Sequence, residues 1–303
     1  MSQDDNSTVL ITNIYDALSA SDQEAAKNPA CFLVVGGDLN GTLINLPDGV
    51  TTLGRQATNT IVLEFNGISK RHFEVKSEKG QCTIRDLGST NGTFVNDQKI
   101  NGPQVLKKND IVKIGTFAFK FLPKGDPERL TYDKLNHEAN TDGLTQCFNK
   151  TYFNQLLDIE VKKSKATGKP LSLIVFDLDH FKKLNDNYGH DAGDYVLKEL
   201  AEITRNRGIR EGDLFARYGG EEFVILLPKT NLKNSFELAE RIRKIIAEHH
   251  FIYDQKRLPV TASLGVADFR PGVLTGVDLF KRADHAAYLS KEKGRNQVNY
   301  YKV

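Results

Sequence analysis

Two adjacent carboxylates follow two glycines in the segment RYGGEEFVILLP, residues 217–228, just before a run of strand-forming apolar residues. Gly219 and Gly220 predict a tight hairpin with a connection of two residues. Glu221 and Glu222 would repel each other at such a turn unless a cation offset their charge. The segment therefore indicates a site that binds something cationic.

The apolar segment LSLIVFDLD, residues 171–179, supplies a third carboxylate. Asp177 ends the apolar run, whereas Asp179 suits the N-cap of the helix expected next. If the hairpin pairs beside this strand, Glu221 comes near Asp177. Two converging carboxylates with backbone carbonyls nearby suit Mg²⁺ ions that carry substrate phosphates. The competing interpretation is an ordinary hairpin with solvated glutamates.

Further polar residues in the same half of the chain could bind a nucleotide. An amide and a carboxylate, Asn185 and Asp194, could read the edge of a guanine base. Three cations are suited to phosphate oxygens, namely Lys182, Lys291 and Arg295. Taken singly, each of these residues is more often a solvated surface residue.

A second polar group lies in the turns of the first half of the chain. It contains two cations, two hydroxyls and an amide, which together fit a phosphate with an adjoining peptide backbone. Each residue alone is better explained as an ordinary turn or surface residue. The five are Arg55, Ser69, Lys70, Thr90 and Asn91.

The elements that must position these residues change in kind along the chain. Over residues 31–122, short β-prone runs alternate with turn clusters and no helical period, which favours an all-β sandwich. Alternating helices and strands follow and predict an α/β (α+β) domain. The expected divisions are a flexible tail at 1–29, a β domain at 30–123, a linker helix at 124–140 and an α/β domain at 141–303.

Composition limits the classes of function. The 41 basic and 39 acidic residues of the 303 nearly cancel, so the net charge of +2 gives no argument for a nucleic-acid partner. Three widely spaced cysteines predict neither a disulfide framework nor a zinc site. Because no segment approaches a membrane span and the N-terminal apolar run is too short for a signal peptide, we expect a cytoplasmic protein.

The elements GR, SxxH and STNGT, spaced over about residues 30–122, resemble the forkhead-associated (FHA) domain. That family is a β-sandwich that binds phosphothreonine peptides. The resemblance implies that the five polar residues of the first half contact the peptide, and that His72 braces the loop presenting Ser69. A phosphorylated Thr8 or Thr12 of the acidic tail could dock there, although an inert tail is an equally good interpretation.

Five segments, DGLTQCFN, FDLDHFKKLNDNYGHDAGD, RYGGEEF, ASLGVA and ADHAAYLSKEKGRN, resemble the GGDEF family of diguanylate cyclases over about residues 141–303. That family condenses two GTP into cyclic di-GMP and releases two pyrophosphates. GGEEF in place of GGDEF exchanges one carboxylate for another and is a known active form. The resemblance implies a catalytic homodimer and a Mg²⁺ or Mn²⁺ cofactor held by Asp177, Glu221 and the carbonyl of Leu178.

The same resemblance implies roles for further residues. Glu221 would also deprotonate the attacking 3′-hydroxyl, and Lys182 would stabilise charge developing on the phosphates. Arg210 and Asp213 have the RxxD spacing of the family's product-inhibition site, where Arg241 could close on the same ligand. The residues implied in substrate binding are Asn185, His190, Asp194, Gly219, Gly220, Lys291 and Arg295.

Three functions compete on these observations. The first is an active cyclase gated by phosphopeptide binding and inhibited by its product. The second is a catalytically silent receptor for cyclic di-GMP, and the third is a scaffold that recruits partners through the FHA-like domain. Asp177, Lys182, Glu221 and Glu222 favour the first, because a site that has lost its activity need not keep them.

Overall fold

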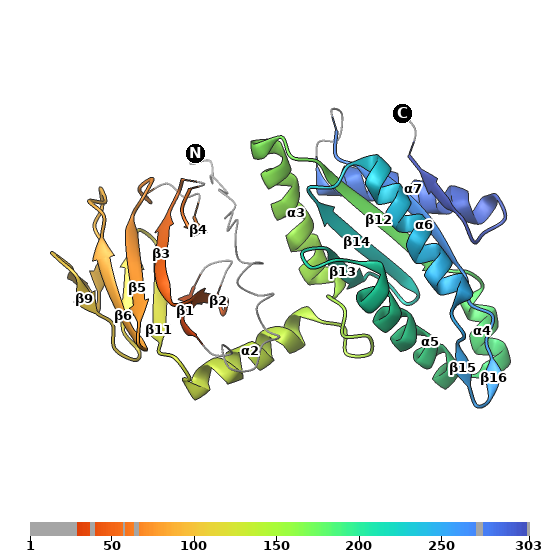
Figure 1. Cartoon of the computed structure of the whole chain (residues 1–303), viewed down its shortest axis with the longest axis horizontal. Coiled ribbons are helices and arrows are strands. Elements are labelled where there is room, and N and C mark those ends of the chain that lie inside the picture. The colour runs from red at the N-terminus through yellow and green to blue at the C-terminus, as the bar shows by residue number, and fades with distance from the viewer. Residues whose placement is uncertain (1–28, 37–39, 57, 64–66, 271–274, 302–303) are drawn as a thin grey trace, which may run out of the picture. The chain divides into compact units, whose positions relative to one another are not determined.

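The computed structural model describes residues 29–36, 40–56, 58–63, 67–270 and 275–301. The chain divides between Ala139 and Asn140 into two compact units. Figure 1 shows that the first unit consists mainly of strands, whereas the second places helices around a sheet. Thr8, Thr12 and the rest of the expected tail before Pro29 lie outside the described residues.

The N-terminal unit is the predicted all-β sandwich, formed by a six-stranded sheet of order β2-β1-β11-β10-β7-β8 and a five-stranded sheet of order β4-β3-β5-β6-β9. Inward-facing side chains of both sheets form one core, in which the Phe32 ring contacts those of Phe73 and Phe119. The strands are β1 (Ala30–Val35), β2 (Leu43–Leu46), β3 (Gly49–Gly54), β4 (Ile61–Val62), β5 (Phe73–Glu78), β6 (Gln81–Asp86), β7 (Phe94–Val95), β8 (Gln98–Lys99), β9 (Gln104–Val105), β10 (Ile111–Ile114) and β11 (Phe117–Leu122).

Helix α2 (Pro127–Asn140) covers the segment expected to be a linker, and it packs against the β-sandwich. The buried Arg129 donates to the carbonyl of Pro29 at 2.6 Å and to Oδ1 of Asn45 at 2.8 Å. One turn further on, Tyr132 packs on an apolar cluster of the sandwich, and Asn136 donates to the carbonyl of Gly41 at 2.7 Å. The helix therefore belongs structurally to the first unit.

The C-terminal unit is the predicted α/β domain, with a five-stranded sheet of order β13-β14-β12-β17-β18. All neighbours in this sheet are antiparallel except β17 and β18, which run parallel. A two-stranded hairpin, β15 (Ile252–Tyr253) and β16 (Lys256–Arg257), stands apart from it. The other elements are α3 (Lys150–Thr167), β12 (Leu171–Leu178), α4 (Phe181–Tyr188), α5 (His190–Ile203), the π-helix η3 (Thr204–Gly208), β13 (Leu214–Arg217), β14 (Glu222–Pro228), α6 (Leu232–Glu248), β17 (Ala262–Asp268), α7 (Gly276–Glu292) and β18 (Val298–Tyr300).

The two faces of this sheet are covered by different helices. Ile174, Phe176 and neighbouring inward residues share a core with α4, α5 and α6. On the opposite face α7 lies directly on β17 at Gly265, where an added Cβ would be 2.1 Å from the carbonyl oxygen of Ala283. Because strand side chains alternate between faces, Asp177 projects on the side of α7. This arrangement brings the last turn of α7 to the end of β12.

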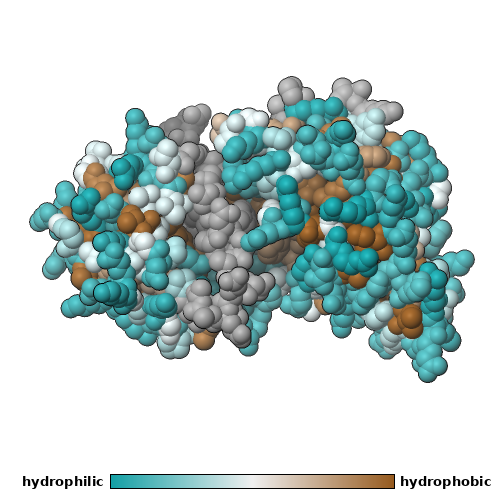
Figure 2. Space-filling model, viewed as in Figure 1, coloured by the Kyte–Doolittle hydropathy of each residue, from teal (hydrophilic) through white to brown (hydrophobic). Residues whose placement is uncertain are grey.

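Within the described residues, no helix combines the length and the apolar content that a membrane span needs. On the face seen in Figure 2, hydrophilic residues predominate and hydrophobic ones are scattered among them. The three cysteines, Cys31, Cys82 and Cys147, are buried free thiols.

Candidate active site

The centre of the site is the end of β12, where Asp177 pairs across the sheet with Glu222 on one side and Ser263 on the other. The ammonium of Lys291 lies 2.9 Å from Oδ2 of Asp177. Burial raises the pKa of Asp177 to about 6; Lys291 opposes this rise, and the charges of Glu221 and Glu222 add to it. Asp177 and Glu221 are half-buried and Glu222 is exposed, and the combined negative charge of the three carboxylates favours a bound cation.

The hairpin connection differs from the predicted two residues. Four residues, Tyr218 to Glu221, join β13 to β14, because the backbone N–H groups of Tyr218 and Gly219 both donate to the carbonyl of Glu222, at 2.8 and 3.2 Å. Neither Gly219 nor Gly220 has the left-handed φ that a two-residue type I′ turn requires. A Cβ added to Gly220 would meet no atom within 4 Å, so this backbone is open to close approach by a ligand.

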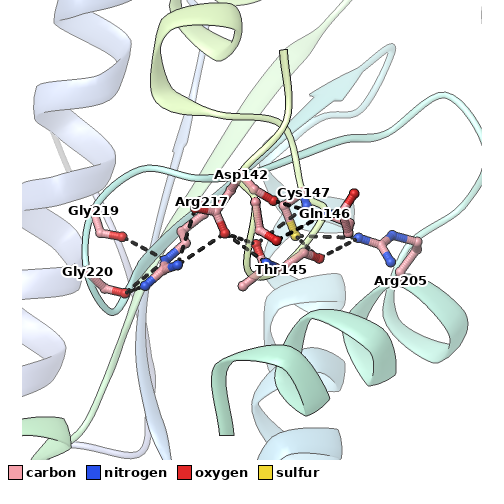
Figure 3. A network of polar contacts seen from close by, with 9 residues as sticks. Asp142, Thr145, Gln146, Cys147, Arg205, Arg217, Gly219 and Gly220 are labelled. Atoms are coloured by element: carbon pink, nitrogen blue, oxygen red, sulfur yellow. Dashed lines mark hydrogen bonds and ion pairs between the residues drawn. The ribbon is translucent and has the colours of Figure 1, made fainter. Parts of the chain in front are cut away.

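Arg217 holds the hairpin connection in place, as Figure 3 shows. Its guanidinium donates to the carbonyl of Gly220 at 2.7 Å and to Oδ1 of Asp142 at 3.1 Å. Asp142 also accepts from the backbone and hydroxyl of Thr145. Burial alone would raise the pKa of Asp142, but these hydrogen bonds and the charge of Arg217 lower it. Arg217 was not among the predicted site residues, although its place two residues before the glycines was a usable signal.

Asp179 does not cap the following helix, so the N-cap prediction was wrong. His180 occupies the N-cap position of α4 with a φ of 57° and makes no side-chain cap bond. The Asp179 carboxylate instead accepts from the hydroxyls of Thr261 and Ser263, at 2.7 and 2.6 Å, and from the backbone of Asn296 at 3.0 Å. These long-range donors satisfy both oxygens, so Asp179 joins β12, β17 and the loop after α7.

The residues expected to read guanine lie on neighbouring helices. Oδ1 of Asn185 on α4 is buried without a hydrogen-bond partner among the described residues. It lies over Gly193 of α5, where an added Cβ would be only 1.9 Å away, and Asp194 follows directly. A buried acceptor without a partner is costly, so this oxygen is available to a donor from a ligand. The side chains of Lys182, His190, Asp194 and Arg295 are exposed to solvent.

The three groups expected to hold a metal would offer only oxygen atoms, which suit a hard divalent cation. They are the carboxylates of Asp177 and Glu221 and the carbonyl of Leu178. Within the described part of the chain, no group of three or more His, Cys, Asp or Glu residues could hold a metal by itself. Mg²⁺ needs no such cage, because it commonly binds through one or two carboxylates together with substrate phosphates and water.

The residues of the expected product site also lie together. Nε of Arg210 lies 3.2 Å from Oδ1 of the buried Asp213, and its Nη2 donates to the hydroxyl of Thr230 at 2.8 Å. Burial raises the pKa of Asp213, while Arg210 and Arg241 oppose the rise. Arg241 donates to the carbonyl of Gly208 at 2.6 Å, at the end of η3. Both arginines therefore have protein partners in this structure.

The five residues expected to contact a peptide are carried by loops of the β-sandwich. The hydroxyl of Ser69 accepts from the backbone of Thr90 at 3.0 Å, and the carbonyl of Ser69 accepts from the backbone of Arg55 at 3.0 Å. Asn91 donates to the carbonyl of Gly67 at 2.8 Å. Arg55, Lys70, Thr90 and Asn91 are exposed and Ser69 is half-buried.

His72 lies beneath these loops and is fully buried. Its Nδ1 accepts from the backbone of Ser69 at 3.1 Å, so the neutral ring carries its proton on Nε2, which lies 3.2 Å from the carbonyl of Gly92. Burial lowers the pKa of His72, which keeps the ring neutral. These contacts agree with a bracing role for His72 in holding the loop of Ser69.

Comparisons with known proteins place both units in families. Residues 139–297 match the family described as "Diguanylate cyclase, GGDEF domain", and residues 51–115 match the FHA domain. Because the first match covers more than half of the chain, the protein belongs to the GGDEF diguanylate cyclase family, with an FHA domain in its N-terminal unit.

Individual relatives resemble the C-terminal unit. Diguanylate cyclase A of Treponema denticola is 41% identical over 172 residues, which is 56% of this chain and 46% of the relative. Diguanylate cyclase DgcP of Pseudomonas aeruginosa is 43% identical over 161 residues, covering 53% of this chain and 24% of the relative. The chain thus spans less than half the length of these two curated relatives.

A solved structure shows the same fold. The coiled coil and GGDEF domain of DgcB from Caulobacter crescentus, in complex with c-di-GMP, superimposes with a TM-score of 0.54 at 32% identity. The match covers 57% of this chain and 91% of that chain.

Proposed function

We propose that the protein is a diguanylate cyclase that joins two GTP molecules into cyclic di-GMP and releases two pyrophosphates. The observation that carries this proposal is the convergence of Asp177, Glu221 and Glu222 at the paired ends of β12 and β14, with Lys291 beside them. Membership of the GGDEF family supports it. A site that had lost its activity would not need this concentration of charge.

Each group has a chemical task in the proposed reaction. Asp177, Glu221 and the carbonyl of Leu178 would hold Mg²⁺ or Mn²⁺, which supplies positive charge to the substrate phosphates when bound. Glu221 accepts the proton of the 3′-hydroxyl, so that the oxygen can attack the α-phosphorus as pyrophosphate departs. Lys182, Lys291 and Arg295 bind phosphate oxygens, while the guanine base and the rest of the nucleotide contact Asn185, His190, Asp194 and the open backbone at Gly219 and Gly220.

The reaction requires two copies of the chain. One site holds one GTP, whereas the product needs each 3′-hydroxyl to attack the α-phosphate of the other nucleotide. Two sites that face each other in a symmetric homodimer meet this requirement. Phosphopeptide binding to the FHA domain regulates this assembly in the proposed scheme, and the fusion of the two domains in one chain supports that step.

The decisive experiment incubates the full chain with GTP and Mg²⁺ and measures nucleotides by liquid chromatography and mass spectrometry. We expect one cyclic di-GMP and two pyrophosphates for every two GTP consumed, and no product when a chelator removes the metal. Failure to form cyclic di-GMP over a range of protein concentrations would overturn the proposal. If the protein then bound cyclic di-GMP in calorimetry, the receptor function would replace it.

Replacing Arg55 by alanine should weaken binding of phosphothreonine peptides at least about 10-fold, because a charge-assisted hydrogen bond to phosphate is lost. The measurement is retention of a degenerate phosphothreonine peptide library on the immobilised protein. Lys124→Ala, which removes an exposed cation from the same unit, serves as the control. Equal retention by wild type and Arg55→Ala would contradict the assigned peptide site.

Replacing Arg210 by alanine should raise the cyclic di-GMP concentration that halves GTP turnover by about 10-fold or more, because a cation for the ligand phosphates is removed. Initial rates are measured with added cyclic di-GMP. Arg207→Ala removes an exposed arginine of η3 and is the matched control. An unchanged inhibition curve for Arg210→Ala would remove this residue from the feedback site.

A further inference from the structure

The loop that follows α7 has an unusual backbone. Gly294, Arg295 and Asn296 all have left-handed conformations, with φ values of 112°, 65° and 45°. This region is readily accessible to glycine, but it costs free energy for residues with a Cβ. Two consecutive non-glycine residues there persist only where surrounding contacts determine the backbone.

Three polar contacts hold this loop, and each comes from a different element. The N–H of Arg295 donates to the carbonyl of Ser290 on α7 at 3.0 Å. The N–H of Asn296 donates to Asp179, just beyond β12, at 3.0 Å. The amide oxygen of Asn296 accepts from Nη1 of Arg243 on α6, also at 3.0 Å.

The side chain of Arg243 on α6 is held in one orientation by its surroundings. Its side chain is only 18% exposed, and its Nε lies 3.0 Å from Oε2 of Glu240 one turn earlier. The ion pair leaves Nη1 directed at the loop, where it meets Asn296. The guanidinium therefore connects α6 with a loop that is 53 residues away in the sequence.

The loop lies next to the proposed nucleotide site. Lys291, which pairs with Asp177, precedes the loop in the chain. Asp179, which accepts the hydrogen bond from Asn296 of the loop, lies two residues after Asp177. The backbone of Arg295 is anchored through its own N–H and through the neighbouring Asn296, while the Arg295 side chain is exposed. A cation carried by a braced turn loses less freedom on binding phosphate than one carried by a flexible loop.

We propose that Arg243 is a positioning residue, which braces the left-handed turn through Asn296 and thereby aims Arg295 at the phosphates of the nucleotide. This inference rests on the proposed cyclase function and adds to it a residue that does not touch the substrate. Without the brace, Arg295 remains in the chain but explores other orientations. The loss should therefore appear in nucleotide binding rather than in the chemical step.

The first test compares steady-state kinetics of Arg243→Ala, Arg243→Lys and Lys244→Ala in the full chain. We expect Arg243→Ala to raise the KM for GTP about 5- to 10-fold, as for the loss of one hydrogen bond of ordinary strength, with kcat changed less than about 2-fold. Arg243→Lys should recover part of this loss. Lys244→Ala removes an exposed cation from the same helix and should behave as wild type. Equal KM values for Arg243→Ala and Lys244→Ala would overturn the inference.

The second test asks whether Arg243 acts through Arg295. On an Arg295→Ala background, adding Arg243→Ala should change the KM by less than about 2-fold, since the group that it positions is already absent. Full additivity of the two effects would overturn the inference. Calorimetry should show weaker binding of a non-hydrolysable GTP analogue by Arg243→Ala but unchanged binding of guanosine, and equal weakening of both ligands would point to a general structural defect instead.

Two controls distinguish a failure of the role proposed for Arg243 from an unstable variant and from a failure of the proposed cyclase function. Asn296→Gly removes the accepting amide while permitting the left-handed backbone, so it replaces Arg243→Ala if the latter is unstable, and it should raise the KM in the same way. Its failure to do so would count against the brace. If wild-type protein formed no cyclic di-GMP, the proposed function would fail, whereas an active wild type with an unaffected Arg243→Ala would reject the brace alone.

Discussion

Glu221→Gln should lower the rate of cyclic di-GMP formation by about 10³-fold or more. The substitution keeps the size of the side chain but removes both the negative charge that would hold the cation and the base that would accept the 3′-hydroxyl proton. Loss of a general base alone typically costs 10²- to 10⁴-fold. Glu221 also lies at the hairpin connection whose backbone contacts the N–H of Leu178, so its place depends on the main chain and survives the change.

The measurement is single-turnover formation of cyclic di-GMP at saturating GTP and Mg²⁺. Glu202→Gln removes an exposed carboxylate from α5 and should keep full activity. The melting temperature of the C-terminal unit should be unchanged in Glu221→Gln, which would show that this unit is folded. Retention of more than about a tenth of the wild-type rate would exclude Glu221 from both assigned roles.

Gly265→Ala should destabilise the C-terminal unit by about 3 kcal/mol. The added Cβ would lie 2.1 Å from both the carbonyl oxygen of Ala283 and the backbone nitrogen of Ala287. These are backbone atoms inside a helix, so they cannot turn aside as the end of a flexible side chain would. The whole of α7 would have to move away from β17, and with it Lys291.

Differential scanning calorimetry should show a lower melting temperature for the C-terminal unit and an unchanged transition for the β-sandwich. Gly143→Ala is the matched control in the same unit, because its added Cβ would meet no atom within 4 Å, and its stability should change by less than about 0.5 kcal/mol. A melting temperature for Gly265→Ala equal to that of the control would show that α7 does not lie as close to β17 as described.

The architecture of both units could be predicted because it depends on local patterns. Short apolar runs between turn clusters specified the β-sandwich, and alternating helices and strands specified the α/β domain. The limits of individual helices and strands were predicted less accurately. The small hairpin of β15 and β16, which precedes β17 in the chain, was not predicted. The short strands of that hairpin carry too few residues for a pattern to emerge.

The sequence could predict which segments come together in the site, but not the individual contacts between their residues. The proximity of the hairpin to Asp177 was foreseeable, since two apolar strand-forming runs in one domain favour pairing in the same sheet despite the repulsion between their carboxylates. The register that sets Glu222 opposite Asp177 depends on the whole ladder from Leu171 to Asp177. The contact of Arg217 with Asp142 joins residues 75 apart, and no local pattern specifies such a pair.

The anchoring of α2 decides which movements this helix can make. Arg129 and Asn136 attach opposite ends of this helix to the backbone of the sandwich, and Lys108 pairs with Asp126 at its start. A helix held at several points moves as a rigid body with the sandwich, and it cannot unfold without breaking these contacts. The last residue of this rigid segment is Asn140, so the order imposed by the sandwich extends along the chain as far as the division between the two units.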